Sequence, residues 1–259
     1  MVQLTNGYCT FVNGGKKIKP VLVNRIQDRR GKTIFLSEYA ECKGCDRFND
    51  TEDNEKLPSV TTILQATQSK EKKESLRKWR ERVGEEEASR ITNQASARGT
   101  EMHYVLEQYC NGIGYLNISK EGALPRMMAH TIVDNLGLFS QVYGTEVSLS
   151  YKDLWAGSSD LIGVYDNKPT IIDFKQSNRP KRDEWVEDYY YQIAAYSLAH
   201  KKQYGPITQG LICICTKDIY YQEFKMDELK LKQYEEKWLE RVEKYYNTKA
   251  TSGPVPQES

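Results

Sequence analysis

Two aspartates and a lysine occur where the chain otherwise has the pattern of two consecutive strands. Asp160 lies in the first predicted strand, and Asp173 and Lys175 lie in the second. A turn centred on Asp166 and Asn167 would place Asp160 directly opposite Asp173, with Lys175 on the same face. Facing carboxylates repel each other, and a divalent cation such as Mg²⁺ removes this conflict because it binds carboxylate oxygens. The pattern therefore predicts a cation site.

Two alternatives remain open for this hairpin. A register slip of one residue would put the two aspartates on opposite faces of the sheet. A surface ion pair on a half-exposed hairpin would also account for the charges. If a cation does bind, Lys175 could orient or deprotonate a water molecule, or it could stabilise charge on a phosphate.

Four polar residues on predicted helices could complete such a site. His103 precedes the strands, and Glu107 lies four residues further on the same helical face, where it could orient the imidazole. Gln192 and Tyr196 are four residues apart on the helix after the hairpin. Taken singly, each is an ordinary helix residue, and a lone helical histidine more often packs than binds a metal.

The elements that must position these residues follow from the spacing of apolar side chains. Ser59 is a suitable N-cap for a helical stretch that begins near Leu57. Leu76, Trp79 and Val83 would form one narrow buried stripe on the next helix. The order of elements predicts an α/β fold in which helices flank a mixed central sheet. We expect further helices at 70–89, 95–111, 129–143, 183–200 and 227–246, and strands at 146–151, 159–165, 170–174, 210–215 and 220–224.

The ends of the chain have patterns of their own. Short strands separated by Gly-containing turns are expected within residues 8–35, followed by a polar loop at 38–56. We therefore expect a β-rich N-terminal extension at 1–56, the main domain at 57–250 and a disordered tail at 251–259.

The cysteines suggest two kinds of role. Cys42 and Cys45 have the spacing of a metal knuckle, and Cys9 could add a thiolate, but a structural zinc site needs a second pair. Cys213 and Cys215 alternate along an apolar strand and should pack on one face. Six free thiols suit a reducing compartment.

The overall composition excludes several classes of protein. Hydrophobic residues make up 39% and charged residues 28% of the chain, which is typical of a globular protein. No apolar run is long enough to cross a bilayer, and no secretory signal is visible, so we expect a cytoplasmic protein. The net charge of +1 argues against a protein that only coats nucleic acid. Local basic clusters are present at Lys70, Lys72, Lys73, Arg77, Lys78, Arg80 and Arg82, and at Arg179, Lys181 and Arg182, and solvated helix and loop faces are the simpler interpretation.

The ordered set of polar residues resembles the RecB-like branch of the PD-(D/E)XK nuclease superfamily. A D-x-K triplet alone is common, whereas the whole set in its helix and strand context is more specific. The chain is similar, more narrowly, to the mitochondrial genome maintenance exonuclease group and its viral or phage relatives, over about residues 57–244. The RecB-like resemblance rests on Gly99-Thr100-x-x-His103-x-x-x-Glu107, Asp160 after Gly157-Ser158-Ser159, Asp173-Phe174-Lys175 and Gln192-x-x-x-Tyr196. The narrower likeness rests further on Leu57-Pro58-Ser59-Val60-Thr61, Lys78-Trp79-Arg80 and Lys175-Gln176-Ser177-Asn178-Arg179-Pro180-Lys181.

This resemblance implies a restriction-endonuclease-like core and a role for each matching residue. One or two Mg²⁺ or Mn²⁺ ions would be held by Asp160, Asp173, His103 and the carbonyl of Phe174. Lys175 would position the attacking water or stabilise the transition state, and Gln192 would orient the phosphate or Lys175. The remaining residues would bind substrate (Ser59, Thr61, Ser177, Tyr196, Arg179 and Lys181) or support the site (Glu107 and Glu146). Gln176 departs from the threonine that often follows the lysine in this branch, which would alter contacts with the substrate.

The implied activity is hydrolysis of phosphodiester bonds in DNA, by in-line attack of water at phosphorus. The family likeness favours a monomeric exonuclease acting on single-stranded DNA in replication, repair or degradation, in the host cytoplasm if the source is viral. A few of the 18 tyrosines could stack on unpaired bases. The alternatives are a structure-specific or duplex endonuclease of the same superfamily, a DNA-binding module without catalysis, and a structural metal-binding protein.

Overall fold

The computed structural model describes residues 25–27, 33–36, 57–112, 122–137 and 139–251. The chain divides into two compact units, Met1–Lys56 and Leu57–Ser259. In the first unit, β1 (Arg25–Gln27) pairs with β2 (Thr33–Leu36) in antiparallel fashion. Cys9, Cys42 and Cys45 lie outside the described residues, as does the tail from residue 252.

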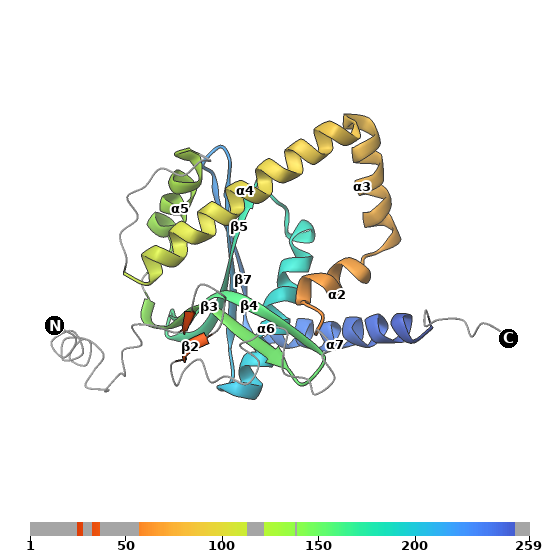
Figure 1. The fold of residues 1–259 in the computed structure, drawn as a ribbon. Helices are drawn as coiled ribbons and strands as arrows, with labels where there is room; N and C mark the ends of the chain where they lie inside the picture. The colour runs from red at the N-terminus through yellow and green to blue at the C-terminus, as the bar shows by residue number, and fades with distance from the viewer. Residues whose placement is uncertain (1–24, 28–32, 37–56, 113–121, 138, 252–259) are drawn as a thin grey trace, which may run out of the picture. The chain divides into compact units, whose positions relative to one another are not determined.

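The second unit is built on a five-stranded mixed sheet with the order β3-β4-β5-β6-β7 (Figure 1). The strands β3 (Phe139–Tyr151), β4 (Trp155–Tyr165) and β5 (Lys168–Ser177) form an antiparallel meander. A crossover through α6 (Glu187–Gln203) then brings β6 (Gln209–Thr216) parallel to β5, and β7 (Tyr221–Met226) returns antiparallel. The prediction of an α/β fold with a mixed central sheet is confirmed.

Helices cover both faces of this sheet and create two cores. On one face, α2 (Val60–Ala66), α6 and α7 (Glu228–Thr251) bury Trp155, Ile171 and Trp238. On the other face, α4 (Glu85–Cys110) and α5 (Leu124–Asn135) bury Ile172 and Phe174. Neighbouring residues of β5 enter opposite cores because side chains alternate along a strand. The second core also contains Cys213 and Cys215, both fully buried, so their predicted packing on one face is confirmed.

The helices before the sheet differ from the expectation in two ways. Gly84 has a φ of 87° and separates α3 (Lys70–Val83) from α4, so α4 starts ten residues before the predicted 95. Its first turn carries three glutamates, which the helix dipole favours. The predicted buried stripe on α3 is wrong: no residue of α3 is buried, and Leu76 is 50% exposed. Helices α3 and α4 meet at Gly84 and diverge from there (Figure 1), so the apolar residues of α3 remain partly in solvent.

The predicted helix at 129–143 is also wrong in its second half. Helix α5 ends at Asn135, and the chain is in β3 from Phe139 onward. The apolar side chains at 139–143 have a spacing that fits a short helix. These residues are extended instead, because β3 pairs with β4 along its whole length. Tertiary hydrogen bonding therefore overrides the local pattern here.

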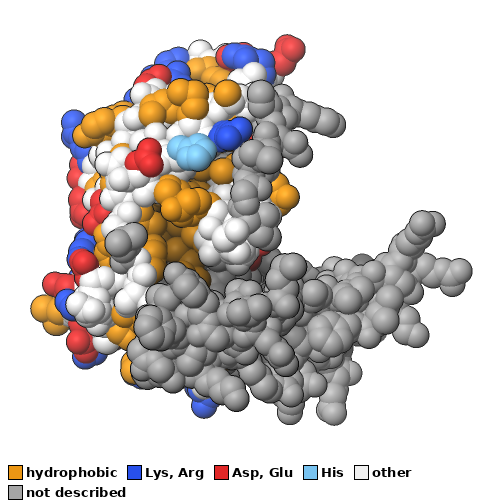
Figure 2. All heavy atoms as spheres, turned by 90° about the vertical axis from the view of Figure 1, so that its left-hand side faces the viewer, with side chains coloured by type: hydrophobic (Ala, Val, Ile, Leu, Met, Phe, Trp, Pro, Cys, Tyr) orange, Lys and Arg blue, Asp and Glu red, His pale blue; other side chains and the backbone are white. Residues whose placement is uncertain are grey.

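Some apolar side chains stay at the surface of this unit. Figure 2 shows hydrophobic side chains gathered on the face that carries α5. Tyr104, Tyr109 and Met127 are each about half exposed. Among the described residues, no helix has the length and apolar character needed to cross a membrane.

Gly163 of β4 provides a test of the sheet geometry. A Cβ added there would lie 2.4 Å from the main-chain oxygen of Gln141 on β3. We expect Gly163→Ala to lower the free energy of unfolding by about 2 kcal/mol or more, because the neighbouring backbone cannot move without breaking pairs. Gly137→Ala is the matched control, since its Cβ would meet only the movable ring of Tyr165 at 3.2 Å. Equal losses for both variants in urea unfolding would contradict this geometry.

Candidate active site

The β4–β5 hairpin has the predicted register. Asp166 and Asn167 both have positive φ, as a two-residue hairpin turn requires. The recorded pairs run from Tyr165↔Lys168 to Leu161↔Ile172, and Asp160 and Asp173 are the next residues on the two strands. Instead of a further main-chain pair, Asp160 Oδ2 accepts a hydrogen bond of 2.7 Å from the main-chain N–H of Phe174. The strands therefore open where the two aspartates lie.

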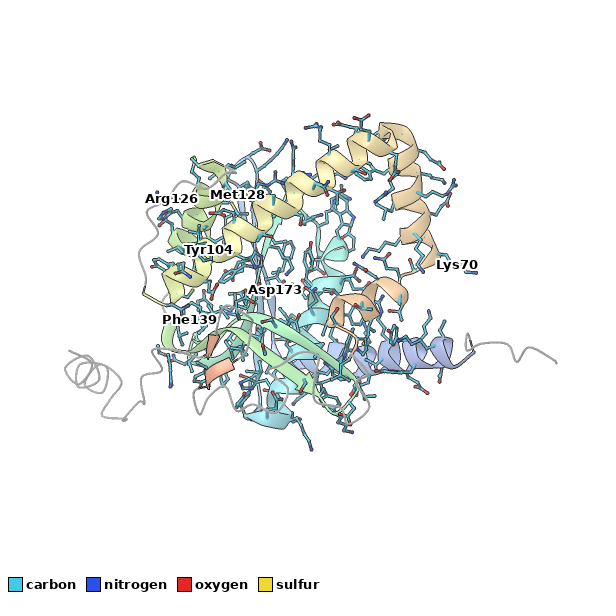
Figure 3. The ribbon with its side chains drawn as sticks, viewed as in Figure 1. Lys70, Tyr104, Arg126, Met128, Phe139 and Asp173 are labelled. Atoms are coloured by element: carbon cyan, nitrogen blue, oxygen red, sulfur yellow. The ribbon has the colours of Figure 1, made fainter. Side chains whose placement is uncertain are left out.

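Asp173 and Lys175 form a buried ion pair at this opening. Asp173 is 4% exposed and lies on β5 in the interior of the larger unit (Figure 3). Lys175 Nζ donates to Asp173 Oδ1 at 2.6 Å and is equally close to Oδ2, which accepts no hydrogen bond of good geometry from the part of the chain that the structure describes. Burial raises the pKa of Asp173, although Lys175 opposes the rise. Burial disfavours the ammonium of Lys175, but Asp173 and Asp160 outweigh this effect and raise its pKa.

His103 reaches the same point from α4. Its Nδ1 lies 3.4 Å from Asp160 Oδ1. Burial disfavours a charged imidazole, but the hydrogen bond and the charge of Asp160 outweigh it and raise the pKa of His103. Burial also opposes the charge on Asp160, yet His103, Lys175 and the N–H of Phe174 together lower its pKa. The two groups thus stabilise each other's charged forms.

Glu146 completes a compact group of possible metal ligands. One ligand atom from each of His103, Glu146 and Asp160 lies within 4.8 Å of the others. Glu146 has a φ of 46° in the middle of β3, a strained conformation for a residue with a side chain. Its carboxylate accepts a hydrogen bond of 3.2 Å from Ser158 Oγ. Loss of hydration raises its pKa, and the charges of Asp160 and Glu107 raise it further.

The residues that lie together in the structure therefore differ from the cation-binding set predicted from the sequence. The sequence analysis assigned Asp160, Asp173, His103 and Phe174 to the cation and gave Glu146 only a supporting role. In the structure Glu146 belongs to the compact group, while Asp173 contacts Lys175. Phe174 presents its main-chain N–H to Asp160, and its side chain is buried in the α4–α5 core.

Two residues that sequence reasoning did not single out lie beside the site. The ring of Tyr189 on α6 is 5.3 Å from Lys175 Nζ. Its position three residues before Gln192, on the same helical face, was the available signal. Arg98 on α4 donates to Gln176 Oε1 at 2.7 Å and 3.1 Å, and Gln176 donates to the carbonyl of Ala95 at 3.0 Å. Gln176 thus joins the end of β5 to the helix that carries His103.

The remaining predicted residues lie in varied surroundings. Gln192 Oε1 is buried and has no hydrogen-bond partner among the described residues, whereas Tyr196 is buried and packs closely against Gly157. Ser59 is the N-cap of α2, as predicted, and accepts from the N–H of Thr62 at 3.0 Å. Thr61 lies on the exposed first turn of the same helix and contacts Ser59 Oγ at 2.9 Å.

Four positions complete the set, three at or just after the end of β5 and one on α4. Ser177 is buried, and its hydroxyl donates to the carbonyl of Arg179 at 2.7 Å. Arg179 is exposed and Lys181 is half-buried. Glu107 contributes its charge near Glu146, and no hydrogen bond joins it to His103 within the described part of the chain.

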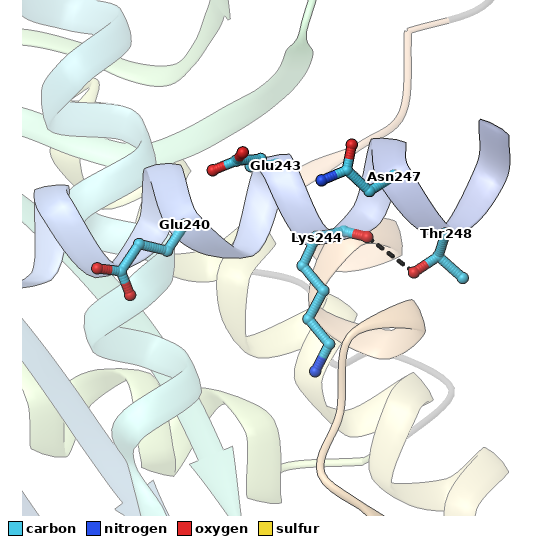
Figure 4. A pocket seen from close by; sticks show the side chains of 5 residues that line it. All are labelled: Glu240, Glu243, Lys244, Asn247 and Thr248. Carbon is cyan, nitrogen blue, oxygen red and sulfur yellow. Dashed lines mark hydrogen bonds between the residues drawn. The ribbon is translucent and has the colours of Figure 1, made fainter. Parts of the chain in front are cut away.

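A shallow hollow on the surface of α7 is separate from this group. It is lined by side chains of one helix, Glu240, Glu243, Lys244, Asn247 and Thr248 (Figure 4). Thr248 donates to the carbonyl of Lys244 at 2.8 Å, which is an ordinary helical contact. Because only side chains of α7 line this hollow, it brings together no groups from separate elements.

Comparison with known proteins finds sequence relatives whose names contain the word exonuclease. No family model matches the chain. It is 29% identical over 204 residues to the human protein called mitochondrial genome maintenance exonuclease 1, covering 74% of this chain and 59% of that protein. The mouse protein of the same name is 31% identical over 214 residues, covering 77% and 62%. The chain thus spans less than two thirds of the length of either relative.

The structural comparison is weaker. A solved protein of Eubacterium rectale, described as a candidate exonuclease, superposes with a TM-score of 0.39 at 14% identity, covering 64% of this chain and 76% of that one. A superposition this loose supports no functional comparison. The sequence relatives support a relationship of this chain to nucleases.

Proposed function

We propose that this chain is a metal-dependent deoxyribonuclease that removes nucleotides from the ends of single-stranded DNA. One observation carries the proposal. Where the hairpin opens, the Asp173–Lys175 ion pair lies beside the carboxylates of Asp160 and Glu146 and the imidazole of His103. A buried ion pair adds little to stability compared with apolar residues. Its presence beside a cluster of metal-binding groups therefore favours a catalytic role.

The donor set fits a hard divalent cation. Carboxylate oxygens with one imidazole suit Mg²⁺ or Mn²⁺, and soft thiolate ligands are absent from the group. The buried Asp173 Oδ2, which lacks a well-formed hydrogen bond, is a further oxygen at the same opening. When bound, the cation would neutralise charge on the phosphate and lower the pKa of a water molecule.

The chain's own residues supply the rest of the chemistry. His103, Glu146 and Asp160 would hold the cation, with Asp173 adjoining. Asp173 keeps Lys175 charged, so that Lys175 would donate hydrogen bonds to the attacking water or to a non-bridging phosphate oxygen. Tyr189 confines the lysine from the other side through a cation–π contact. Gln192, with its unpartnered carbonyl oxygen, would orient the phosphate or Lys175.

Further observations support DNA as the substrate and a preference for single-stranded DNA. The curated relatives carry the word exonuclease in their names. Helix α3 presents seven basic side chains along its exposed surface, and Arg179 and Lys181 follow the catalytic strand. Ser59 and Thr61 could contact phosphates, although Ser59 Oγ already accepts the capping hydrogen bond.

A first prediction concerns the metal. We expect Mn²⁺ at about 100 times its Kd to raise the melting temperature by roughly 5–10 °C, because only the folded state holds the ligands together. Asp160→Asn should abolish this shift. Asp166→Asn, on the exposed turn of the same hairpin, is the matched control and should retain it. An undiminished shift in Asp160→Asn, measured by scanning calorimetry, would refute the assigned cation site.

A second prediction concerns Lys175. Replacing it with alanine should lower the rate of DNA hydrolysis by about 100-fold or more, because a preorganised donor to the transition state is lost. Lys168→Ala removes an exposed lysine from the other end of the same strand and should leave the rate unchanged. The rates are measured with end-labelled DNA under single-turnover conditions. Full activity of Lys175→Ala would rule out the proposed role.

A third prediction concerns the substrate. Linear single-stranded, linear duplex and circular single-stranded DNA are each incubated with Mg²⁺, with Mn²⁺ or with EDTA. We expect degradation of the linear single strand only, and none in EDTA. Cutting of the circle would instead support the endonuclease alternative, and binding without any cleavage would support a non-catalytic DNA-binding module.

A further inference from the structure

The loop between β5 and α6 presents an arrangement of side chains that the proposed catalytic group does not use. Residues 178–186 begin three positions after Lys175 and end three positions before Tyr189, which contacts Lys175. Trp185 in this loop is 46% exposed. The guanidinium of Arg182 lies 5.2 Å from its ring centroid, and that of Arg179 lies 5.7 Å from it.

The backbone of this loop is held at several points. Ser177 Oγ donates to the carbonyl of Arg179 at 2.7 Å. The side chain of Gln222 on β7 accepts from the N–H of Lys181 at 2.7 Å and donates to its carbonyl at 3.0 Å. Trp185 N–H donates to the carbonyl of Arg182 in a 3₁₀ turn, in which side chains three residues apart lie one above the other. The loop therefore fixes where its basic side chains emerge.

The positive charge on this loop is only partly compensated. Within the described residues, no carboxylate lies within ion-pair distance of Arg179 or Lys181. Arg182 has one long contact with Glu184, 3.9 Å between exposed groups, which is weak. Asp183 is already engaged by the hydroxyl of Tyr190 and, at 3.5 Å, by Lys230.

The crowding of positive charge extends to helix α3. Burial, together with the charges of Arg179 and Lys72, lowers the pKa of Lys181. Lys72 itself pairs with Asp188. A polyanion that approached this loop would meet cations held close together, which the nearby carboxylates compensate only in part.

We propose that Arg179, Arg182 and Trp185 form a clamp for the phosphate backbone of the DNA strand next to the cleavage site. A guanidinium that stacks on an indole keeps its N–H donors free in the plane, where they match phosphate oxygens. Trp185 thus holds the two arginines in place before the strand arrives, which reduces the entropy lost on binding. The clamp rests on the proposed function for the identity of its ligand.

The location of the loop fits this role. Arg179 is four positions after Lys175, so their Cα atoms are at most ~14 Å apart. A single DNA strand spans that distance with only a few nucleotides. A strand whose scissile phosphate reaches Lys175 would therefore carry a neighbouring phosphate to the clamp.

The test is a binding measurement with the full chain in EDTA, so that no cleavage is needed. The probe is a fluorescently labelled oligothymidylate, titrated at several salt concentrations between ~50 and ~200 mM. We expect Arg179→Ala/Arg182→Ala to reduce the salt slope of log K by about 1.4, since each phosphate contact on a single strand contributes ~0.7. Lys201→Ala, which removes a cation at the other end of α6, should change the slope by much less.

Trp185 is tested separately because its replacement changes no charge. Trp185→Ala should weaken binding about five-fold, the loss expected when two exposed cation–π contacts no longer orient the arginines. Trp185→Phe should restore most of the affinity. An oligothymidylate with an uncharged methylphosphonate backbone should bind poorly to every form of the protein.

Other results would refute the clamp or the proposed nuclease. If Arg179→Ala/Arg182→Ala had the same salt slope of log K as Lys201→Ala, the two arginines would not contact phosphate. An equal loss on Trp185→Ala for the charged and the uncharged backbone would assign Trp185 to the bases instead. A chain that binds as expected but cleaves no DNA would refute the proposed nuclease alone, whereas cleavage with uniform binding across the variants would refute the clamp alone.

Discussion

The burial of charge at the open end of the β4–β5 hairpin is the constraint on which the arrangement of the larger unit depends. An isolated carboxylate in a protein interior is strongly unfavourable unless donors or cations compensate it. Asp160 receives the N–H of Phe174 and the imidazole of His103, and Asp173 receives the ammonium of Lys175. The first of these donors is available only because the strands stop pairing at Leu161 and Ile172.

This compensation requires residues from both helical layers to meet at one place. His103 comes from α4 on one face of the sheet, and Tyr189 comes from α6 on the other. Arg98 and Gln176 join α4 to the end of β5 through side-chain hydrogen bonds. A polar link of this kind fixes the distance between the imidazole and the carboxylates more strictly than apolar packing alone would.

Charge is distributed unevenly around the end of β5, although the chain as a whole is nearly neutral. Acidic groups gather inside the opening, and basic groups gather on the loop that follows Lys175 and on α3. Under the proposed function, a strand of nucleic acid would be attracted locally without the protein being basic overall.

The sequence predicts the mixed sheet and the turn at Asp166 and Asn167, because turn preference and side-chain alternation act over a few residues, but it leaves a one-residue slip of the hairpin register open. It did not determine the end of α5, the exposure of α3 or the grouping of Glu146 with His103 and Asp160. Those features depend on pairing and packing between segments far apart in the chain. Residues 139–143 are extended because pairing of β3 with β4 stabilises them more than a local helix would. The strained backbone of Glu146 persists only because the surrounding structure holds it.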